Sequence, residues 1–218
     1  MLTKSLPKAM MPIEGKPFLE REIALLHSKG ISDFVICIGY LGQVIEEHFG
    51  DGHRFGVSIM YVSDWPKMLG PAGALKKAAP LLADSFFVTY GDAYLRMNYV
   101  DMLRSLVESE ALGVMAVYRN KNAHGRSDLE VENGRIVRYD KRGGEAMEWI
   151  NYGVTALRKQ ALRLIPSKGP CDEEKFYGML IARSKLLAYK VRNRFYEIGT
   201  PSSLEEFRMF IRTREHHL

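Results

Sequence analysis

Acidic residues beside two apolar segments are the first candidates for chemistry. Asp92 follows the apolar run Phe86–Tyr90 and one glycine, and open α/β sheets bind ligands at the carboxyl ends of their strands. Glu197 lies among apolar residues in Phe195–Pro201, where a partly buried carboxylate needs a partner such as a cation. Together they would supply the one or two carboxylates that Mg²⁺ takes alongside substrate phosphates. Each has a plainer interpretation, since Asp92 would also cap a turn and Glu197 would also precede a helix.

Lysines on restrained segments are the candidates for phosphate binding. Lys8 and Lys16 flank an apolar stretch, Pro7–Ile13, in which prolines restrict the backbone. Lys141 follows a predicted hairpin, and Asn151 comes soon after it. A lysine and an asparagine on neighbouring segments suit a phosphorylated sugar, because the first binds phosphate and the second binds hydroxyl groups. The alternative is a set of solvated surface side chains, which is common for lysine.

A predicted helix start, Leu69–Leu75, carries two glycines and one proline. Its exposed N–H groups would contact an anion or a base. The segment matches neither GxGxxG nor the P-loop pattern. The six histidines form no HExxH pattern, and the chain has no GxSxG segment or Cys/His pairing, so no motif predicts covalent catalysis.

Composition and charge exclude several classes of protein. The 218 residues carry 31 basic and 26 acidic side chains, a net charge of +5, but the basic residues are dispersed, so no dedicated nucleic-acid site is expected. No apolar stretch approaches the roughly 20 residues that cross a bilayer. The first residues are not a signal peptide, and two cysteines, Cys37 and Cys171, provide no disulfide framework. A cytoplasmic location is therefore expected.

Helix and strand patterns alternate up to residue 118, which is typical of a layered α/β domain with a largely parallel sheet. The expected helices are 17–29, 41–49, 72–82 and 98–108, and the expected strands are 34–38, 57–62, 85–90 and 113–118. Strand 34–38 is continuously apolar, which predicts a central strand covered on both faces.

The second half of the sequence predicts an antiparallel excursion. Two alternating arms surround Asn133 and Gly134, which predicts a hairpin over 129–139. The other expected elements are a strand at 149–157, a short helix at 159–165, a strand at 185–191 and a helix at 203–213. Since no linker interrupts the pattern, one domain is expected over 1–218.

The order of these segments resembles the sugar-1-phosphate nucleotidyltransferase family. LPKAMMPIEGKPFLEREI is similar to the family pattern PKPMxPxxGKPxLExxI, and further similar segments follow in the family's order: ISDFVICIGYLGQVIEEHFGDGHRFGVSIMY, LGPAGALKKAAPLL, FFVTYGD, NGRIVRYDK, WINYGV and FYEIGTPSSLEEF. The chain looks most like the short bacterial members without a C-terminal β-helix. The resemblance implies a Rossmann-like three-layer α/β sandwich with a mostly parallel sheet and an inserted antiparallel hairpin, the nucleotide-diphospho-sugar transferase fold.

The resemblance also implies an activity. In the family a sugar 1-phosphate attacks the α-phosphate of a nucleoside triphosphate (NTP), which gives an NDP-sugar and pyrophosphate. The implied cofactor is Mg²⁺, and the implied partners are an NTP and a sugar 1-phosphate, without nucleic acid or membrane. A homo-oligomer is compatible with the resemblance. The sequence does not choose among guanylyl, cytidylyl, uridylyl and thymidylyl transfer, and the prediction leans to a guanylyltransferase acting on a mannose- or heptose-type 1-phosphate.

Family roles transfer to individual positions. Lys8 matches the phosphate-binding lysine and Lys141 the lysine near the sugar phosphate, so both, with Asp92, are the implied catalytic residues. Asp92 and Glu197 match the two Mg²⁺ carboxylates. The loop along the nucleobase and the strand beneath the sugar are matched respectively by Leu69, Gly70 and Gly73, and by Asn151 and Gly153.

The sequence departs from the family pattern at several of these places. Many members have Asp where Glu197 stands, Pro71 replaces the usual Thr, and the segment at Lys141 lacks the proline of the EKP-like motif.

The family's opening strand and glycine-rich loop, ILAGGxGTRLxPLT, are the largest departure. Met1–Thr3 align with the end of that segment, so the first central strand and the backbone donors for the triphosphate are expected to be missing from the 218 residues. A non-catalytic nucleotide- or sugar-phosphate-binding or regulatory subunit of the same fold is therefore the alternative to the enzyme.

Overall fold

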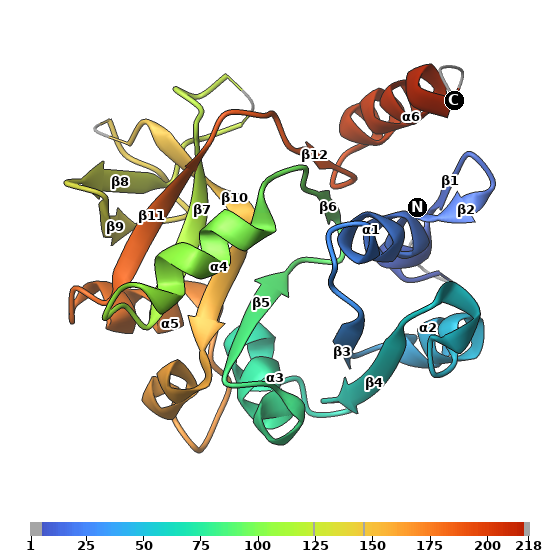
Figure 1. Cartoon of the computed structure of the whole chain (residues 1–218), viewed down its shortest axis with the longest axis horizontal. Helices are drawn as coiled ribbons and strands as arrows, with labels where there is room; N and C mark the ends of the chain where they lie inside the picture. The colour runs from blue at the N-terminus through green and yellow to red at the C-terminus, as the bar shows by residue number, and fades with distance from the viewer. Residues whose placement is uncertain (1–5, 124, 146, 216–218) are drawn as a thin grey trace. The chain divides into compact units, whose positions relative to one another are not determined.

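The computed structural model in Figure 1 describes residues 6–123, 125–145 and 147–215. The chain divides into two compact units. Unit 1 consists of Met1–Pro66, Tyr90–Arg96 and Phe195–Leu218, and unit 2 consists of Lys67–Thr89 and Met97–Arg194. The single domain expected over 1–218 stays a prediction.

Unit 1 has three pairs of strands and three α-helices within the part that the structure describes. Its elements are η2 (Lys8–Met10), β1 (Pro12–Ile13), β2 (Lys16–Pro17), α1 (Phe18–His27), β3 (Asp33–Ile38), α2 (Gly42–Phe49), η3 (His53–Phe55), β4 (Ser58–Ser63), β6 (Ala93–Tyr94), β12 (Tyr196–Glu197) and α6 (Pro201–Glu215). The β1–β2 and β6–β12 pairs are antiparallel, whereas β3 and β4 are parallel. The predicted helices at 17–29, 41–49 and 203–213 are confirmed within a few residues.

The β3–β4 pair shares an apolar core with helices α1 and α2. Ile38 and Ile59 from the strands pack with Ile23 of α1 and Phe49 of α2. Strand β3 differs from its prediction as a central strand, because within the described chain it is hydrogen-bonded to β4 alone. Cys37, within this apolar run, is exposed.

An aromatic cluster joins α6 to the short β6–β12 pair. The ring of Phe207 lies 5.2 Å from Phe18, at the start of α1, and 5.0 Å from Tyr94 in β6. Tyr196 in β12 stacks on Phe210 at 4.2 Å. Because buried aromatic side chains contribute large apolar areas, this cluster anchors two strands that are each only two residues long.

Unit 2 is built on a six-stranded sheet of order β5-β10-β7-β11-β9-β8. Its elements are α3 (Gly70–Ala78), η4 (Ala79–Leu81), β5 (Ser85–Thr89), α4 (Tyr99–Val107), β7 (Gly113–Arg119), β8 (Leu129–Glu132), β9 (Arg135–Tyr139), β10 (Trp149–Arg158), η5 (Lys159–Leu164), α5 (Glu173–Ile181) and β11 (Leu186–Val191).

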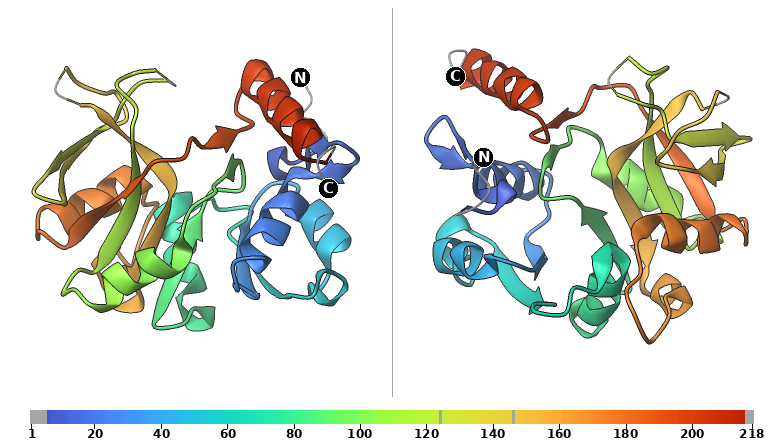
Figure 2. Two further views of the ribbon diagram at one scale, coloured as in Figure 1. Left: turned by 45° about the horizontal axis from the view of Figure 1, so that its top comes forward. Right: turned by 180° about the vertical axis from the view of Figure 1, so that it is seen from behind.

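Helices α4 and α5 cover opposite faces of this sheet. The ring of Tyr99 in α4 contacts Phe87 of β5, whereas the neighbouring Phe86 and Val88 pack into the core that contains Phe176 of α5. Side chains alternate between the two faces of a strand, so the two helices lie on different sides. The same arrangement can be followed in Figure 1 for α4 and, from behind, in the right view of Figure 2 for α5, drawn in orange.

The α/β class is confirmed, but more of the strand pairs are antiparallel than the prediction of a mostly parallel sheet implied. Only β3–β4 and β7–β11 are parallel among the described pairs, while the other described pairs are antiparallel. The expected hairpin is β8–β9, with Glu132 opposite Arg135 across Asn133 and Gly134. The segment predicted as a helix at 159–165 is the 3-10 helix η5, and α5 was not predicted.

Within the described ranges, no helix is long and apolar enough to cross a membrane.

Phe207→Ala is expected to lower the free energy of unfolding by about 3–5 kcal/mol, because the ring is fully buried and its removal leaves a cavity. Urea denaturation measures the change. Met209→Ala, on the same helix with a side chain 55% exposed, is the matched control and should change stability by less than about 0.5 kcal/mol. Equal effects of the two substitutions would contradict the packing role of Phe207.

Candidate functional site

Unit 1 brings together the predicted phosphate-binding lysine and one predicted metal ligand. The ammonium of Lys8, at the start of η2, lies 2.5 Å from Oδ2 of Asp92. Lys16 does not join the pair, since it forms an ion pair with Glu20 at 3.5 Å.

The β6–β12 pair places Glu197 next to the same segment. Glu197 is opposite Ala93, and the N–H of Ile198 donates to the carbonyl of Asp92 at 3.1 Å. The N–H of Gly199 donates to Oε2 of Glu197. A side chain at position 199 would overlap that carboxylate and lie 3.4 Å from the Lys8 ammonium. Gly199 therefore leaves space between the Glu197 carboxylate and the Lys8 ammonium, which both belong to the predicted site.

The carboxylates of Asp92 and Glu197 in unit 1 fit a divalent cation that prefers oxygen ligands and that takes its other ligands from a bound substrate. Asp92 and Glu197 offer carboxylate oxygens only, and the Asp92 side chain is 39% exposed. No cluster of three or more His, Cys, Asp or Glu side chains that could hold a metal occurs among the described residues. Two carboxylates without a third protein ligand suit Mg²⁺, which usually keeps positions for phosphate oxygens and water.

In unit 2, the predicted nucleobase loop is crossed closely by another segment. Gly70 has φ of +74°, and a Cβ at this position would approach the Cys171 carbonyl to 2.7 Å. The N–H group of Cys171 donates to the Leu69 carbonyl at 2.8 Å. Glycine is required here both for its backbone conformation and for the close approach.

The crossing corrects one expectation about this helix start. The N–H groups of Ala72 and Gly73 both donate to the Cys171 carbonyl at 3.1 Å, so they are not exposed donors for an anion or a base. The prediction that Leu69, Gly70 and Gly73 border a nucleotide stays a prediction. Any contribution of Gly73 comes from its lack of a side chain rather than from its N–H group.

Asn151 and Gly153 lie at an irregularity of β10, where the register with β7 shifts between Asn151 and Thr155. Gly153 has φ of +104°, and its N–H donates to Oδ1 of Asn151 at 3.0 Å. The Asn151 N–H in turn donates to Oδ1 of Asp128 at 2.9 Å. Bulges of this kind re-aim side chains next to functional sites.

Burial raises the pKa of Asp128 to about 6, although the Asn151 N–H and the charge of Lys141 act in the opposite direction. Burial also raises the pKa of Tyr139, whose side chain shares a hydrogen bond with Asn151. A polar network therefore surrounds the two predicted sugar-binding positions.

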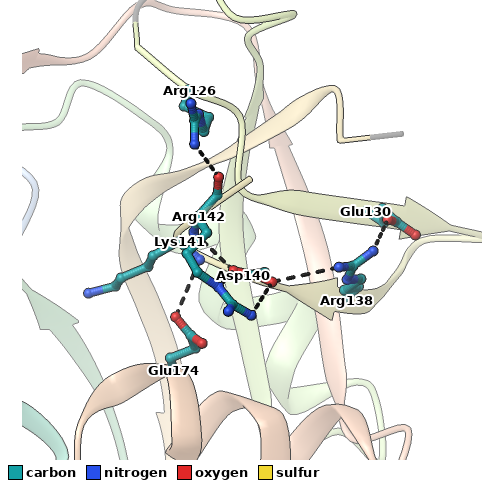
Figure 3. Close-up of polar contacts among 7 residues, drawn as sticks. All are labelled: Arg126, Glu130, Arg138, Asp140, Lys141, Arg142 and Glu174. Atoms are coloured by element: carbon teal, nitrogen blue, oxygen red, sulfur yellow. Dashed lines mark hydrogen bonds and ion pairs between the residues drawn. The ribbon is translucent and has the colours of Figure 1, made fainter. Parts of the chain in front are cut away.

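In the loop after β9, Lys141 lies between Asp140 and Arg142, whose side chains form an ion pair with each other. Asp140 accepts hydrogen bonds from the Arg142 guanidinium at 3.0 and 3.1 Å, and Arg142 lowers the pKa of Asp140 to about 2. The Lys141 N–H donates to Oε2 of Glu174 at 3.3 Å, as Figure 3 shows. The Lys141 ammonium forms an ion pair with Glu173.

Sequence reasoning missed Glu173, Glu174, Asp128 and Tyr139. A signal was present for the first two, because Asp172 is an N-cap residue followed by two acidic residues and then by apolar residues at helical spacing. The roles of Asp128 and Tyr139 had no comparable signal, since both depend on contacts between distant strands. Roles in catalysis and ligand binding stay predictions for every residue named above.

The family model and the similar curated proteins all name nucleotidyltransferases. Residues 1–214 match the model of a family described as "Nucleotidyl transferase". A D-glycero-alpha-D-manno-heptose 1-phosphate guanylyltransferase from Campylobacter jejuni is 24% identical over 206 residues, which are 94% of this chain and 91% of that protein. A UTP–glucose-1-phosphate uridylyltransferase from Synechocystis is 29% identical over 183 residues. That match covers 76% of this chain, which thereby spans about half (47%) of the relative's length.

The fold has a counterpart among solved structures. HddC from Yersinia pseudotuberculosis superposes with a TM-score of 0.81 at 19% identity, covering 95% of this chain and 91% of that chain. At this identity the similarity is evidence for the fold alone.

Asp128→Asn is expected to stabilise the protein at neutral pH but not in acid. Because burial raises the folded-state pKa of Asp128 from 3.8 to about 6, the folded state binds the proton more tightly, and stability falls as pH rises through that window. Asn keeps a hydrogen-bond acceptor without a charge to bury. The variant should exceed the wild type in free energy of unfolding by up to about 3 kcal/mol at pH 7.5.

Urea denaturation at pH 4 and pH 7.5 measures this difference. The two proteins should be nearly equal at pH 4, and Asp101→Asn, at an exposed helix position, serves as the control. A difference that does not change between the two pH values would rule out titration of Asp128 as its cause.

Proposed function

The chain belongs to the nucleotidyl transferase family, and from that membership we propose that it transfers a nucleoside monophosphate from an NTP to a sugar 1-phosphate. The single observation that carries the proposal is the cluster of Lys8, Asp92 and Glu197. These residues come from three separate segments of the sequence, and a lysine–carboxylate contact and a two-residue ladder join them. Two carboxylates and a lysine are the groups that bind and polarise a polyphosphate.

The reaction needs positioned charges rather than a protein nucleophile. An oxygen of the sugar phosphate forms the new bond to the α-phosphorus of the NTP, while the bond from that phosphorus to the bridging oxygen breaks and pyrophosphate leaves with the electron pair. Lys8 donates to phosphate oxygens on which negative charge develops. Lys141 holds the phosphate of the sugar substrate, and Asn151 donates to a sugar hydroxyl.

Asp92 and Glu197 would hold Mg²⁺, whose chemistry when bound is to neutralise phosphate charge and orient the phosphate oxygens. The Lys8 ammonium donates to Oδ2 of Asp92, and the Gly199 N–H donates to Oε2 of Glu197.

The substrate pair we propose is GTP with a heptose- or mannose-type 1-phosphate, because the relative from Campylobacter jejuni, matched over nearly its whole length, is named for guanylyl transfer to a heptose phosphate. We expect the protein to act in the cytoplasm, where nucleoside triphosphates are present.

Pyrophosphate release tests the proposed function. The protein is incubated with Mg²⁺ and each of GTP, CTP, UTP and dTTP against heptose, mannose and glucose 1-phosphates. We expect release with at least one pair, strictly dependent on both substrates and abolished by EDTA. Binding of a nucleotide and a sugar phosphate without release under any condition would favour the non-catalytic alternative and would contradict the enzyme.

Asp92→Asn is expected to lower Mg²⁺-dependent turnover by about 10²- to 10³-fold, the usual loss when one charge-stabilising group is removed. The substitution preserves side-chain volume, so thermal unfolding should change little. Asp101→Asn, which removes a carboxylate from an exposed Arg104 pair, is the matched control and should keep wild-type turnover. Near-normal activity in Asp92→Asn would remove this residue from the proposed metal site.

A further inference from the structure

Residues in the first turn of α5 bind Lys141 through both its backbone N–H and its side-chain ammonium. Asp172 caps the helix by accepting the Lys175 N–H at 2.7 Å. The next two residues face the loop instead, since Glu173 pairs with the Lys141 ammonium and Glu174 accepts the Lys141 backbone N–H. Three consecutive acidic residues therefore have three different partners, and two of these partners are parts of the same lysine.

Glu173 is the more buried of the two acids that face Lys141. Its side chain is only 11% exposed, whereas that of Lys141 is 53% exposed. A buried carboxylate requires a compensating charge and hydrogen bonds. An ammonium has three donors, so Lys141 can keep its bond to Glu173 and still donate to a ligand from its solvent-facing side.

A hydrogen-bonded chain connects this ion pair to Asn151. The side chains of Asn151 and Tyr139 share a hydrogen bond, and the Tyr139 hydroxyl donates to Oε1 of Glu173 at 3.4 Å. The same Oε1 faces the Lys141 ammonium. Tyr139 and Glu173 thus link the two side chains that the proposed function assigns to the sugar phosphate, and Glu173 is the one that contacts Lys141.

We propose that Glu173 is a positioning residue that aims the Lys141 ammonium at the phosphate of the sugar substrate. The inference rests on the proposed function for its ligand, while the tether between the two side chains is independent of it. A free lysine side chain loses conformational entropy when it is ordered. A lysine already held by Glu173 has lost part of that freedom before the substrate arrives.

The tether should respond to pH near neutrality. The ionisable groups facing Glu173 are Lys141 and Tyr139 from β9 and its loop, and Glu174 and Tyr177 from α5 itself. Burial, followed by the charge of Glu174, raises the pKa of Glu173 to about 7. The carboxylate is therefore charged and holds the lysine above that pH, and it becomes neutral and releases the lysine below it.

The test without substrate follows Lys141 by NMR in protein whose lysines carry ¹³C-methyl groups, with the resonance assigned by its loss in Lys141→Arg. We expect a titration step near pH 7 in the wild type and its loss in Glu173→Gln. Glu174→Gln should keep the step but move it to lower pH, because one source of the raised pKa of Glu173 is gone. Asp128→Asn should also keep it, which separates Glu173 from the other acid that influences Lys141.

A wild-type Lys141 resonance without a step near pH 7, or a step that persists in Glu173→Gln, would overturn the tether. This readout needs no turnover, so it decides the tether even if the proposed activity fails.

Kinetics with GTP and α-D-mannose 1-phosphate test the positioning role. At pH 8, Glu173→Gln should raise KM for the sugar phosphate about tenfold while KM for GTP stays within about twofold, and it should have no further effect in a Lys141→Ala background. Glu110→Gln, at an exposed position, is the control for a lost surface carboxylate. A further tenfold loss in the Lys141→Ala background would mean that Glu173 acts on the fold rather than through Lys141, and would overturn the proposal.

Discussion

The pairing of β6 with β12 is the constraint on which the candidate site of unit 1 depends. Unit 1 is assembled from three stretches of sequence, and this two-residue ladder sets the second stretch beside the third. A ladder of that length is too short to be stable by itself. The aromatic rings of Phe18, Tyr94, Tyr196 and Phe207 bury the strands against α1 and α6, so the positions of Asp92 and Glu197 follow from the apolar packing of Tyr94 and Tyr196, which lie one or two residues away.

In unit 2, the segment from Cys171 into the first turn of α5 has a corresponding role. The Cys171 carbonyl accepts hydrogen bonds from the N–H groups of Ala72 and Gly73 in α3, and the carboxylates of Glu173 and Glu174 reach the loop after β9. Four consecutive residues therefore tie the predicted nucleobase loop to the predicted sugar-phosphate lysine. A displacement of this segment would move both, which is a physical basis for the two substrates that we propose to bind in a defined relation.

Local sequence patterns predicted most of the long elements, with α5 (Glu173–Ile181) as the exception, and failed for the short ones. The continuously apolar run at 34–38 folds as a strand, and the arms around Asn133 and Gly134, whose residues alternate between apolar and polar, fold as a hairpin. Strands β6 and β12 have no such pattern, since two residues define no period. The candidate residues Lys8, Asp92 and Lys141 were predicted from their places in loops and after strands, and the family resemblance then implied their roles. Glu173 required the folded chain, because its partner lies 32 residues earlier.

In the absence of substrate, each lysine that we assign to a phosphate forms an ion pair with a carboxylate, but the two pairs lie in different environments. Lys8 and Asp92 are both more than a third exposed, so water competes with their contact and the pair contributes little stability. It can separate easily when a polyphosphate and a cation arrive. The partner of Lys141 is buried, and breaking that pair would leave an uncompensated charge. Lys8 is therefore suited to change partners during a reaction, whereas Lys141 is suited to keep its carboxylate and add the phosphate as a second acceptor.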